Sequence, residues 1–169
     1  MSAVIRAAAL WLERGSRVVM ATVIDGGTGN LLESGCQRAI NDAGTAAGSL
    51  GDEVLDEIVS RQAQALMADG ETRVLTFPEA GEACVFLERV DERRVINRLI
   101  FALDEGEACA WVTDLTTGLA CTVSNGLAQG SLGLDRSALV AVGSLMAEAA
   151  SATLSTGLES SVFVRTYKP

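Results

Sequence analysis

The chain of 169 residues contains no histidine, and its 13 lysines and arginines are outnumbered by 22 aspartates and glutamates. Histidine is the commonest general base and the usual member of a catalytic triad, so its absence weighs against hydrolase chemistry while leaving carboxylate mechanisms open. The net charge of -9 disfavours nucleic acid as a partner, because proteins that track phosphates carry the opposite charge. Neither a hydrolase nor a nucleic-acid-binding protein is therefore favoured.

Cysteine pairs at metal-ligand spacing are also missing. The four cysteines, Cys36, Cys84, Cys109 and Cys121, form no C-x-x-C pair, which disfavours a zinc site. Cys84 lies in the apolar stretch ACVFLE, without the neighbouring cation or helix start that makes a thiol reactive. We expect Cys84 to be buried and inert, and an enzyme that uses carboxylates or this thiol is the least favoured function.

Long apolar runs are absent as well. The first residues, MSAVIRAAALWLERG, place apolar side chains at helical spacing from Val4 to Leu12, which indicates an amphipathic helix rather than a signal peptide. The apolar window SALVAVGSLMAEAASATL is interrupted by Gly143 and Glu148, so it lacks the purity of a membrane span. We expect a cytoplasmic protein without a membrane partner, and an apolar fraction of 49% is compatible with a homodimer.

Helical and strand periods alternate along the chain, which predicts an α+β fold. The expected elements are a helix ending near Gly15, strands at 17–24 and within 34–42, a short strand leading into Gly48, a helix at 52–68, strands at 72–77 and 83–90, a helix within 91–106, strands at 108–115 and within 118–126, a helix at about 135–150 and a strand at 160–167.

The order of these segments repeats. Leu12, Gly15 and Thr22 recur as Leu103, Gly106 and Thr113 at one constant spacing, and the phrase G-S-L-G at 48–51 recurs at 130–133. The repetition predicts a duplicated helix–strands–helix–strand unit, with pseudo-repeats at about 3–90 and 91–169. We expect the two copies to form a single pseudo-twofold domain, with a mixed sheet and helices packed on it.

Two glycine-rich turns are candidate binding sites. Gly48, Ser49 and Gly51 precede a helix, and free amide groups at a helix start attract anions. A turn with a helix cap is the favoured alternative, because Asp52 and Glu53 place acid where a phosphate would lie. The phrase lacks the lysine of a P-loop, so a nucleotide triphosphatase is not indicated.

The turn DGGTGN at 25–30 could also bring a ligand close to its backbone amides, at Gly27, Thr28 and Gly29. A hairpin loop accounts for the same residues and is the favoured interpretation.

The ordered motifs resemble the N-terminal domain of the XdhC/CoxI family, the accessory proteins of xanthine dehydrogenase and carbon monoxide dehydrogenase. LWLERGSRVVMATVI is similar to the opening of that domain, and GCQRAINDAGTAAGSLGDE keeps its glycines in register. Cys84 with VFLERV, WVTDLTTG, the second G-S-L-G and VFVRTYKP follow in the family's order. The resemblance covers nearly the whole chain.

Three features depart from the family pattern. The segment GGTGNLL occupies the position where the family has G-S-x-P-R. Asp52 and Glu53 replace glycines, and Cys84 is followed by Val85 and Phe86 instead of two glycines. Family members usually continue into a Rossmann domain, whereas this sequence stops at Pro169. We therefore expect a single N-terminal-like domain without that C-terminal domain.

The resemblance implies an accessory or chaperone protein that binds, protects or inserts a molybdopterin-type molybdenum cofactor. By this resemblance the cofactor-binding residues are Gly27, Thr28, Gly29, Gly48, Ser49, Gly51 and Cys84, and no metal ligand is expected. The implied partner is a molybdenum hydroxylase subunit or a maturation factor. The alternative is a degenerate member that acts as a protein-interaction scaffold without the cofactor.

Overall fold

The computed structural model describes residues 2–29, 32–156 and 160–169, and the chain divides into an N-terminal unit (3–91) and a C-terminal unit (92–169). The N-terminal unit contains α1 (Ser2–Glu13), β1 (Val18–Asp25), β2 (Gln37–Asn41), β3 (Ala46–Gly48), α2 (Glu53–Asp69), β4 (Arg73–Phe77), the short 3₁₀ helix η1 (Pro78–Ala80) and β5 (Ala83–Arg89). The C-terminal unit contains α3 (Arg93–Asp104), β6 (Cys109–Asp114), β7 (Ala120–Ser124), β8 (Leu127–Gly130), α4 (Arg136–Glu148), β9 (Ala152–Thr156) and β10 (Ser160–Tyr167).

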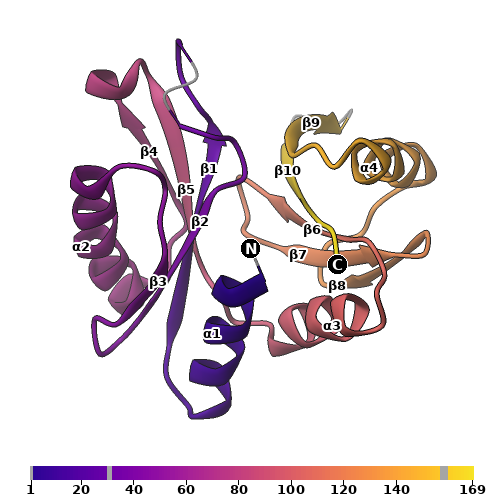
Figure 1. Ribbon diagram of the computed structural model, residues 1–169, viewed down its shortest axis with the longest axis horizontal. Helices are drawn as coiled ribbons and strands as arrows, with labels where there is room; N and C mark the ends of the chain where they lie inside the picture. Colours follow the sequence, from indigo (N-terminus) through magenta and orange to yellow (C-terminus); the bar gives the residue numbers. More distant parts are fainter. Residues whose placement is uncertain (1, 30–31, 157–159) are drawn as a thin grey trace. The chain divides into compact units, whose positions relative to one another are not determined.

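The two units share one strand order (Figure 1). The N-terminal sheet runs β3-β2-β1-β5-β4, and the C-terminal sheet runs β8-β7-β6-β10-β9. The register is also repeated, since Thr22 in β1 pairs with Gln37 and its counterpart Thr113 in β6 pairs with Ala120. The expected α+β class and its duplicated unit are confirmed.

The sheets differ from the expectation in their strand directions and in two of their strands. Every neighbouring pair of described strands is antiparallel, so neither sheet is mixed. Short hairpins join most neighbours, and antiparallel pairing is what a short connection permits. The strands β8 and β9 are not among the expected elements, because four or five residues such as LAQG show no clear alternation.

The core of the N-terminal unit lies between its sheet and α2. Leu55, Val59 and Leu66 from α2 are buried against strand residues such as Val19 and Leu87. The helix begins where the Asp52 carboxylate accepts a hydrogen bond from the Leu55 amide at 3.0 Å. Figure 1 shows α1 on the other side of this sheet from α2.

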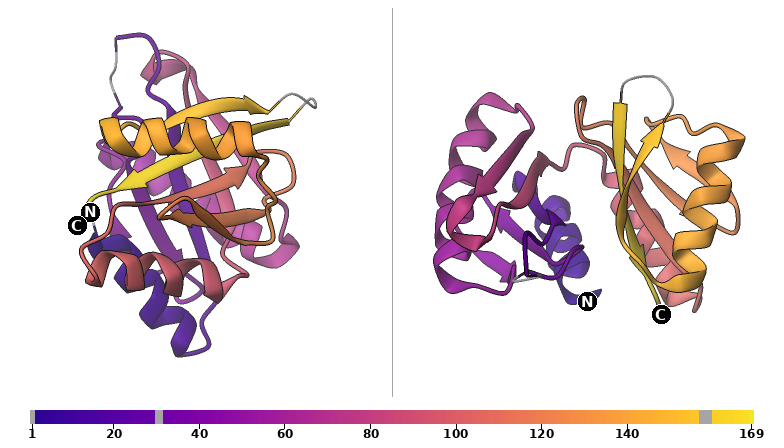
Figure 2. Two further views of the ribbon diagram at one scale, coloured as in Figure 1. Left: turned by 90° about the vertical axis from the view of Figure 1, so that its right-hand side faces the viewer. Right: turned by 90° about the horizontal axis from the view of Figure 1, so that it is seen from above.

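The C-terminal unit packs one helix on each face of its sheet. Val142 of α4 is buried against Val112 and Val164, and Figure 2 shows α4 lying along β9 and β10. On the opposite face, α3 buries Ile96 and Leu99 over β6 and β7. Val142 is the one fully buried residue of α4, whereas α2 has six buried residues.

The first glycine of the G-S-L-G phrase lies too close to the neighbouring strand for any side chain, and this close approach occurs in both copies. Gly48 has φ +85°, and a Cβ there would lie 2.4 Å from the carbonyl oxygen of Gln37. Gly130 has φ +152°, and its Cβ would lie 2.3 Å from the carbonyl oxygen of Ala120. Because Gln37 and Ala120 hold equivalent places in the two registers, each edge strand needs glycine at this point.

Burial keeps two of the thiols protonated. It raises the pKa of Cys109 to about 11, and the Glu107 carboxylate adds to the rise. It raises the pKa of Cys121 to about 12, with a further contribution from Glu92. Cys36 and Cys84 are half-buried.

We expect Gly48→Ala and Gly130→Ala each to lower the free energy of unfolding by about 2–4 kcal/mol, since both add backbone strain and a clash with a carbonyl oxygen. Gly133→Ala is the matched control, because a Cβ at Gly133 meets nothing within 4 Å. Its effect in urea unfolding should stay within about 0.5 kcal/mol. Equal losses in all three variants would refute the packing explanation.

A second prediction concerns the buried thiols. At pH 8 a thiol reagent should label Cys36 and Cys84 in the native protein but label Cys109 and Cys121 only after unfolding, as measured by mass spectrometry of peptides.

The raised pKa values of Cys109 and Cys121 favour the protonated thiol in the folded state. The free energy of unfolding should therefore be full below about pH 8.5 and fall as the pH rises toward 11–12. Rapid native labelling of Cys121 would contradict this arrangement.

Candidate functional site

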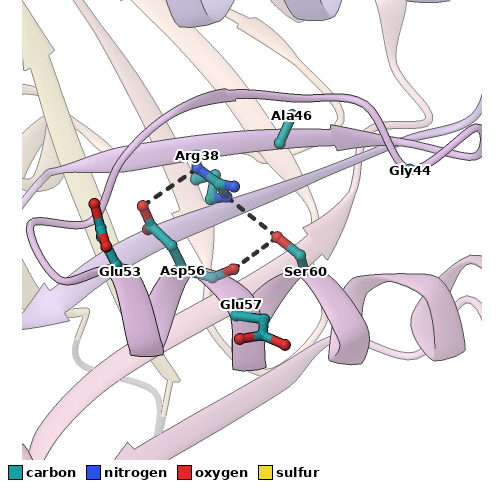
Figure 3. A pocket seen from close by; sticks show the side chains of 7 residues that line it. All are labelled: Arg38, Gly44, Ala46, Glu53, Asp56, Glu57 and Ser60. Carbon is teal, nitrogen blue, oxygen red and sulfur yellow. Dashed lines mark hydrogen bonds and ion pairs between the residues drawn. The ribbon is translucent and has the colours of Figure 1, made fainter.

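An ion pair between β2 and α2 holds the first G-S-L-G turn in place (Figure 3). The Arg38 guanidinium donates to the Gly48 carbonyl at 2.6 Å and to the Asp56 carboxylate at 3.3 Å. Its Nε also donates to the Ser60 hydroxyl at 3.2 Å. Asp56 is 7% exposed and Arg38 is half-buried, so the pair is partly withdrawn from solvent and bridges β2 to the helix.

The amides of this turn are largely used inside the protein. The Leu50 amide donates to the second oxygen of Asp56 at 2.8 Å, and the Gly51 amide donates to the Ser49 hydroxyl at 3.1 Å. The Asp52 carboxylate caps the first turn of α2. Side chains of this chain therefore occupy the positions that a bound phosphate would need at these amides.

A pocket of about 390 Å³ opens beside the ion pair and is lined by Arg38, Gly44, Ala46, Glu53, Asp56, Glu57 and Ser60. It carries three carboxylates and one guanidinium, and the guanidinium is already bound to three groups. This balance of charge repels an anion. The pocket and the adjoining turn do not fit the phosphate of a molybdopterin-type cofactor.

The other glycine turn, between β1 and β2, contacts the turn between β4 and β5. The Gly27 amide donates to the Asp25 carboxylate at 2.9 Å, and the Thr28 amide donates to the Gly81 carbonyl at 2.7 Å. A Cβ at Gly27 would lie 2.5 Å from the Ala80 carbonyl oxygen. Gly27 is therefore required by this contact between turns, whereas Gly29 has open space around it. Asn30, the last residue of the expected turn, lies outside the described residues.

Cys84 lies at the start of β5, next to this pair of turns. Its Sγ is 3.7 Å from the Thr76 hydroxyl and 3.5 Å from the Glu82 carbonyl oxygen. The expectation of a buried Cys84 is wrong, because the side chain lies near the start of β5 on the face opposite α2 and is only half-buried. Within the described residues, no charged side chain forms a hydrogen bond or ion pair with its sulfur.

The expected site residues thus fall into two groups. Gly27, Thr28 and Cys84 meet at one end of the sheet, where β1 pairs with β5. The first G-S-L-G begins at Gly48, the last residue of β3, which is an edge strand three places from β5, and it leads into α2 on the other face. Within residues 2–29, 32–156 and 160–169, no group of three or more cysteines or carboxylates could hold a metal ion.

Sequence reasoning missed Arg38, Asp56 and Ser60. Comparison of the two repeats contained a signal for them, because Arg38 and Asp56 are replaced together by Cys121 and Leu139 in the second copy. A buried charge must change with its partner, so a paired loss of opposite charges marks an ion pair.

Removing one member of the Arg38–Asp56 ion pair should leave the other charge largely buried without a partner. We expect Asp56→Leu and Arg38→Cys each to lower the free energy of unfolding by about 3 kcal/mol. The double variant copies the second repeat, so it should lose less than the sum of the single variants by about 1–3 kcal/mol in urea unfolding. Strict additivity would show that the two side chains are not coupled.

None of the helices in the described part of the chain has the length and apolar character that crossing a bilayer requires.

Three comparisons bear on the family. A crystal structure of a xanthine dehydrogenase from Bacillus halodurans is similar to the chain with a TM-score of 0.68 and 17% sequence identity, over 99% of this chain and 53% of that chain. At this identity the likeness establishes the fold, and the chain spans about half the length of that protein. No curated protein sequence matches the chain. Residues 11–78 match the model of the XdhC and CoxI family, so the resemblance to this family that the sequence predicts is confirmed.

Proposed function

We propose that the chain is an accessory protein in the maturation of a molybdenum hydroxylase, and that it acts by binding the hydroxylase subunit or a maturation factor. The family match at residues 11–78 supports an accessory role. The observation that carries the choice of protein binding is the G-S-L-G turn, whose Leu50 and Gly51 amides donate to Asp56 and Ser49. Because these two amides already donate within the chain, the turn stabilises the fold and offers few free donors to a phosphate.

A second candidate function is handling of a molybdopterin-type molybdenum cofactor. The observation that favours it is the meeting of the Gly27–Gly29 turn with the half-buried Cys84 at one end of the N-terminal sheet. In this candidate, the Gly29 amide and the Cys84 thiol would hold the cofactor, which supplies the metal chemistry of the hydroxylase. The Gly27 and Thr28 amides already donate inside the protein, so we rank this candidate second.

The experiment mixes the purified chain with the cofactor-free hydroxylase subunit of the same organism and follows the complex by calorimetry and gel filtration. We expect a complex with a Kd below about 10 μM, because a specific interface of ordinary size reaches this affinity readily. Failure of both the hydroxylase and its maturation factors to bind would overturn the proposal.

The cofactor arm uses the same protein and free molybdopterin cofactor, with retention measured by molybdenum analysis after desalting. Protein binding without retention supports the first function. Retention that Cys84→Ala removes and Cys36→Ala leaves intact would support the second. Ser49→Asp adds charge at the G-S-L-G turn while keeping an acceptor for the Gly51 amide, so it should change neither result. Retention lost in Ser49→Asp would place a phosphate at this turn and contradict our assignment.

A further inference from the structure

Helix α3 carries a cluster of arginines that its counterpart lacks. The spacing that relates the two repeats aligns α3 with α1, and Arg93, Arg94 and Arg98 then replace Ser2, Ala3 and Ala7. The six-residue segment 93–98 thus contains three of the 13 cationic residues of the chain, although the net charge of the chain is -9. The duplicated fold does not require them, because α1 forms without them.

These arginines oppose the stability of their own helix. Arg93 and Arg94 lie in the first turn of α3, where the macrodipole disfavours positive charge, and Glu92 makes no side-chain cap. Helix α2 shows the stabilising arrangement, with Asp52 as its cap and Glu53 in its first turn. Helix α4 also begins with an arginine, Arg136, but it has a single one, and Asp135 caps that helix. Two adjacent arginines at an uncapped helix start, as in α3, cost stability and point to a role outside folding.

No carboxylate among the described residues forms an ion pair with Arg93, Arg94 or Arg98. Arg61 of α2 and Arg73 of β4 differ in this respect, since Arg61 pairs with Glu57 and Arg73 pairs with Asp69. In a chain rich in acid, three unpaired arginines leave positive charge available to a partner.

An exposed aromatic ring lies beside the arginines. Phe101 is 51% exposed, and the Arg98 guanidinium lies 5.1 Å from the centre of its ring. Arg98 also donates to the Ser124 hydroxyl at 3.4 Å, so two contacts within this chain orient its guanidinium without a partner. Arginine and aromatic side chains contribute most to the binding energy of protein interfaces, and preformed positions lower the entropic cost.

A polar pocket of about 360 Å³ adjoins this surface. It is lined by Glu92, Arg94, Gln129, Gly130 and Ser131, which belong to the start of α3, the end of β8 and the turn that follows. The single acid and the single base leave the pocket without strong net charge. It can accept a polar side chain of a partner next to the arginines.

We propose that the α3 surface, formed by Arg93, Arg94, Arg98 and Phe101, docks an acidic segment of a partner protein. Carboxylates of that segment meet the arginines, and one apolar side chain covers Phe101. Charge complementarity selects this occupant, since the arginines lack carboxylates of their own and the rest of the chain is acidic. Nucleic acid fits poorly, because the net charge of -9 repels a long polyanion. The proposal rests on the proposed function for the existence of a protein partner, and names the surface that meets it.

The test measures fluorescence anisotropy of a labelled synthetic peptide in which glutamates flank one leucine, at low salt. The same peptide with glutamines is the control ligand. We expect the glutamate peptide to bind at least about fivefold more tightly, and Arg93→Glu with Arg94→Glu to weaken its binding about tenfold. Phe101→Ala should weaken it about fivefold. Salt should weaken binding of the glutamate peptide, as screening requires.

The control protein carries Arg14→Glu and Arg61→Glu, which change the net charge equally at exposed positions outside α3. Its affinity should stay within about twofold of the unchanged chain. The α3 variant should keep its fold and gain about 1–4 °C in Tm, because glutamates suit a helix start. Equal peptide affinity in the two variants would overturn the proposal. So would equally tight, arginine-dependent binding of duplex DNA, or self-association of the chain that Arg93→Glu abolishes.

The hydroxylase separates this proposal from the proposed function. If the cofactor-free hydroxylase binds the unchanged chain and the α3 variant equally well, the accessory role stands and the α3 surface is wrong. If the hydroxylase and the maturation factors bind neither protein while the glutamate peptide binds only the unchanged chain, the α3 surface stands and the accessory role is wrong.

Discussion

The fold of each unit depends on the close approach of one glycine to the neighbouring strand. At Gly48 and Gly130 the edge strand ends against a carbonyl oxygen of the adjacent strand, at a distance that any side chain would block. The chain then leaves the sheet and forms a helix, α2 or α4. This helix leads to the opposite edge of the sheet, where the next two strands, β4 and β5 or β9 and β10, are added. The strand order of each sheet follows from that crossing, so the repeated phrase is first of all a structural device.

The two units hold the same turn by different chemistry. In the N-terminal unit, Arg38 and Asp56 join β2 to α2 through charged hydrogen bonds that also fix the Gly48 carbonyl and the Leu50 amide. In the C-terminal unit, Cys121 and Leu139 occupy the equivalent positions in an apolar cluster. The ion pair gives orientation at the cost of desolvating two charges, whereas the apolar pair packs without directional bonds. One backbone geometry is thus compatible with both solutions.

The sequence was sufficient for features that local patterns encode. The apolar stripe of α2 and the capping residue Asp52 define a helix within a few residues, and the repeated spacing of Thr22 and Thr113 aligns the two sheets. It was not sufficient for β8 and β9, whose short strands form through pairing with longer neighbours. The bonds of Arg38 to Asp56 and of Thr28 to Gly81 join residues far apart in the sequence, and no local pattern reveals such contacts.

A duplicated unit offers an internal comparison that separates folding from function. Positions that serve the fold are repeated, as Gly48 and Gly130 are, or are replaced together, as Arg38 and Asp56 are. The arginines of α3 follow neither rule, since they appear in one copy, lack carboxylate partners among the described residues, and oppose the helix dipole. They also lie outside residues 11–78, where the family match ends. A surface of this kind is explained by what it binds, and in our proposal α3 is the part of the chain that selects the partner.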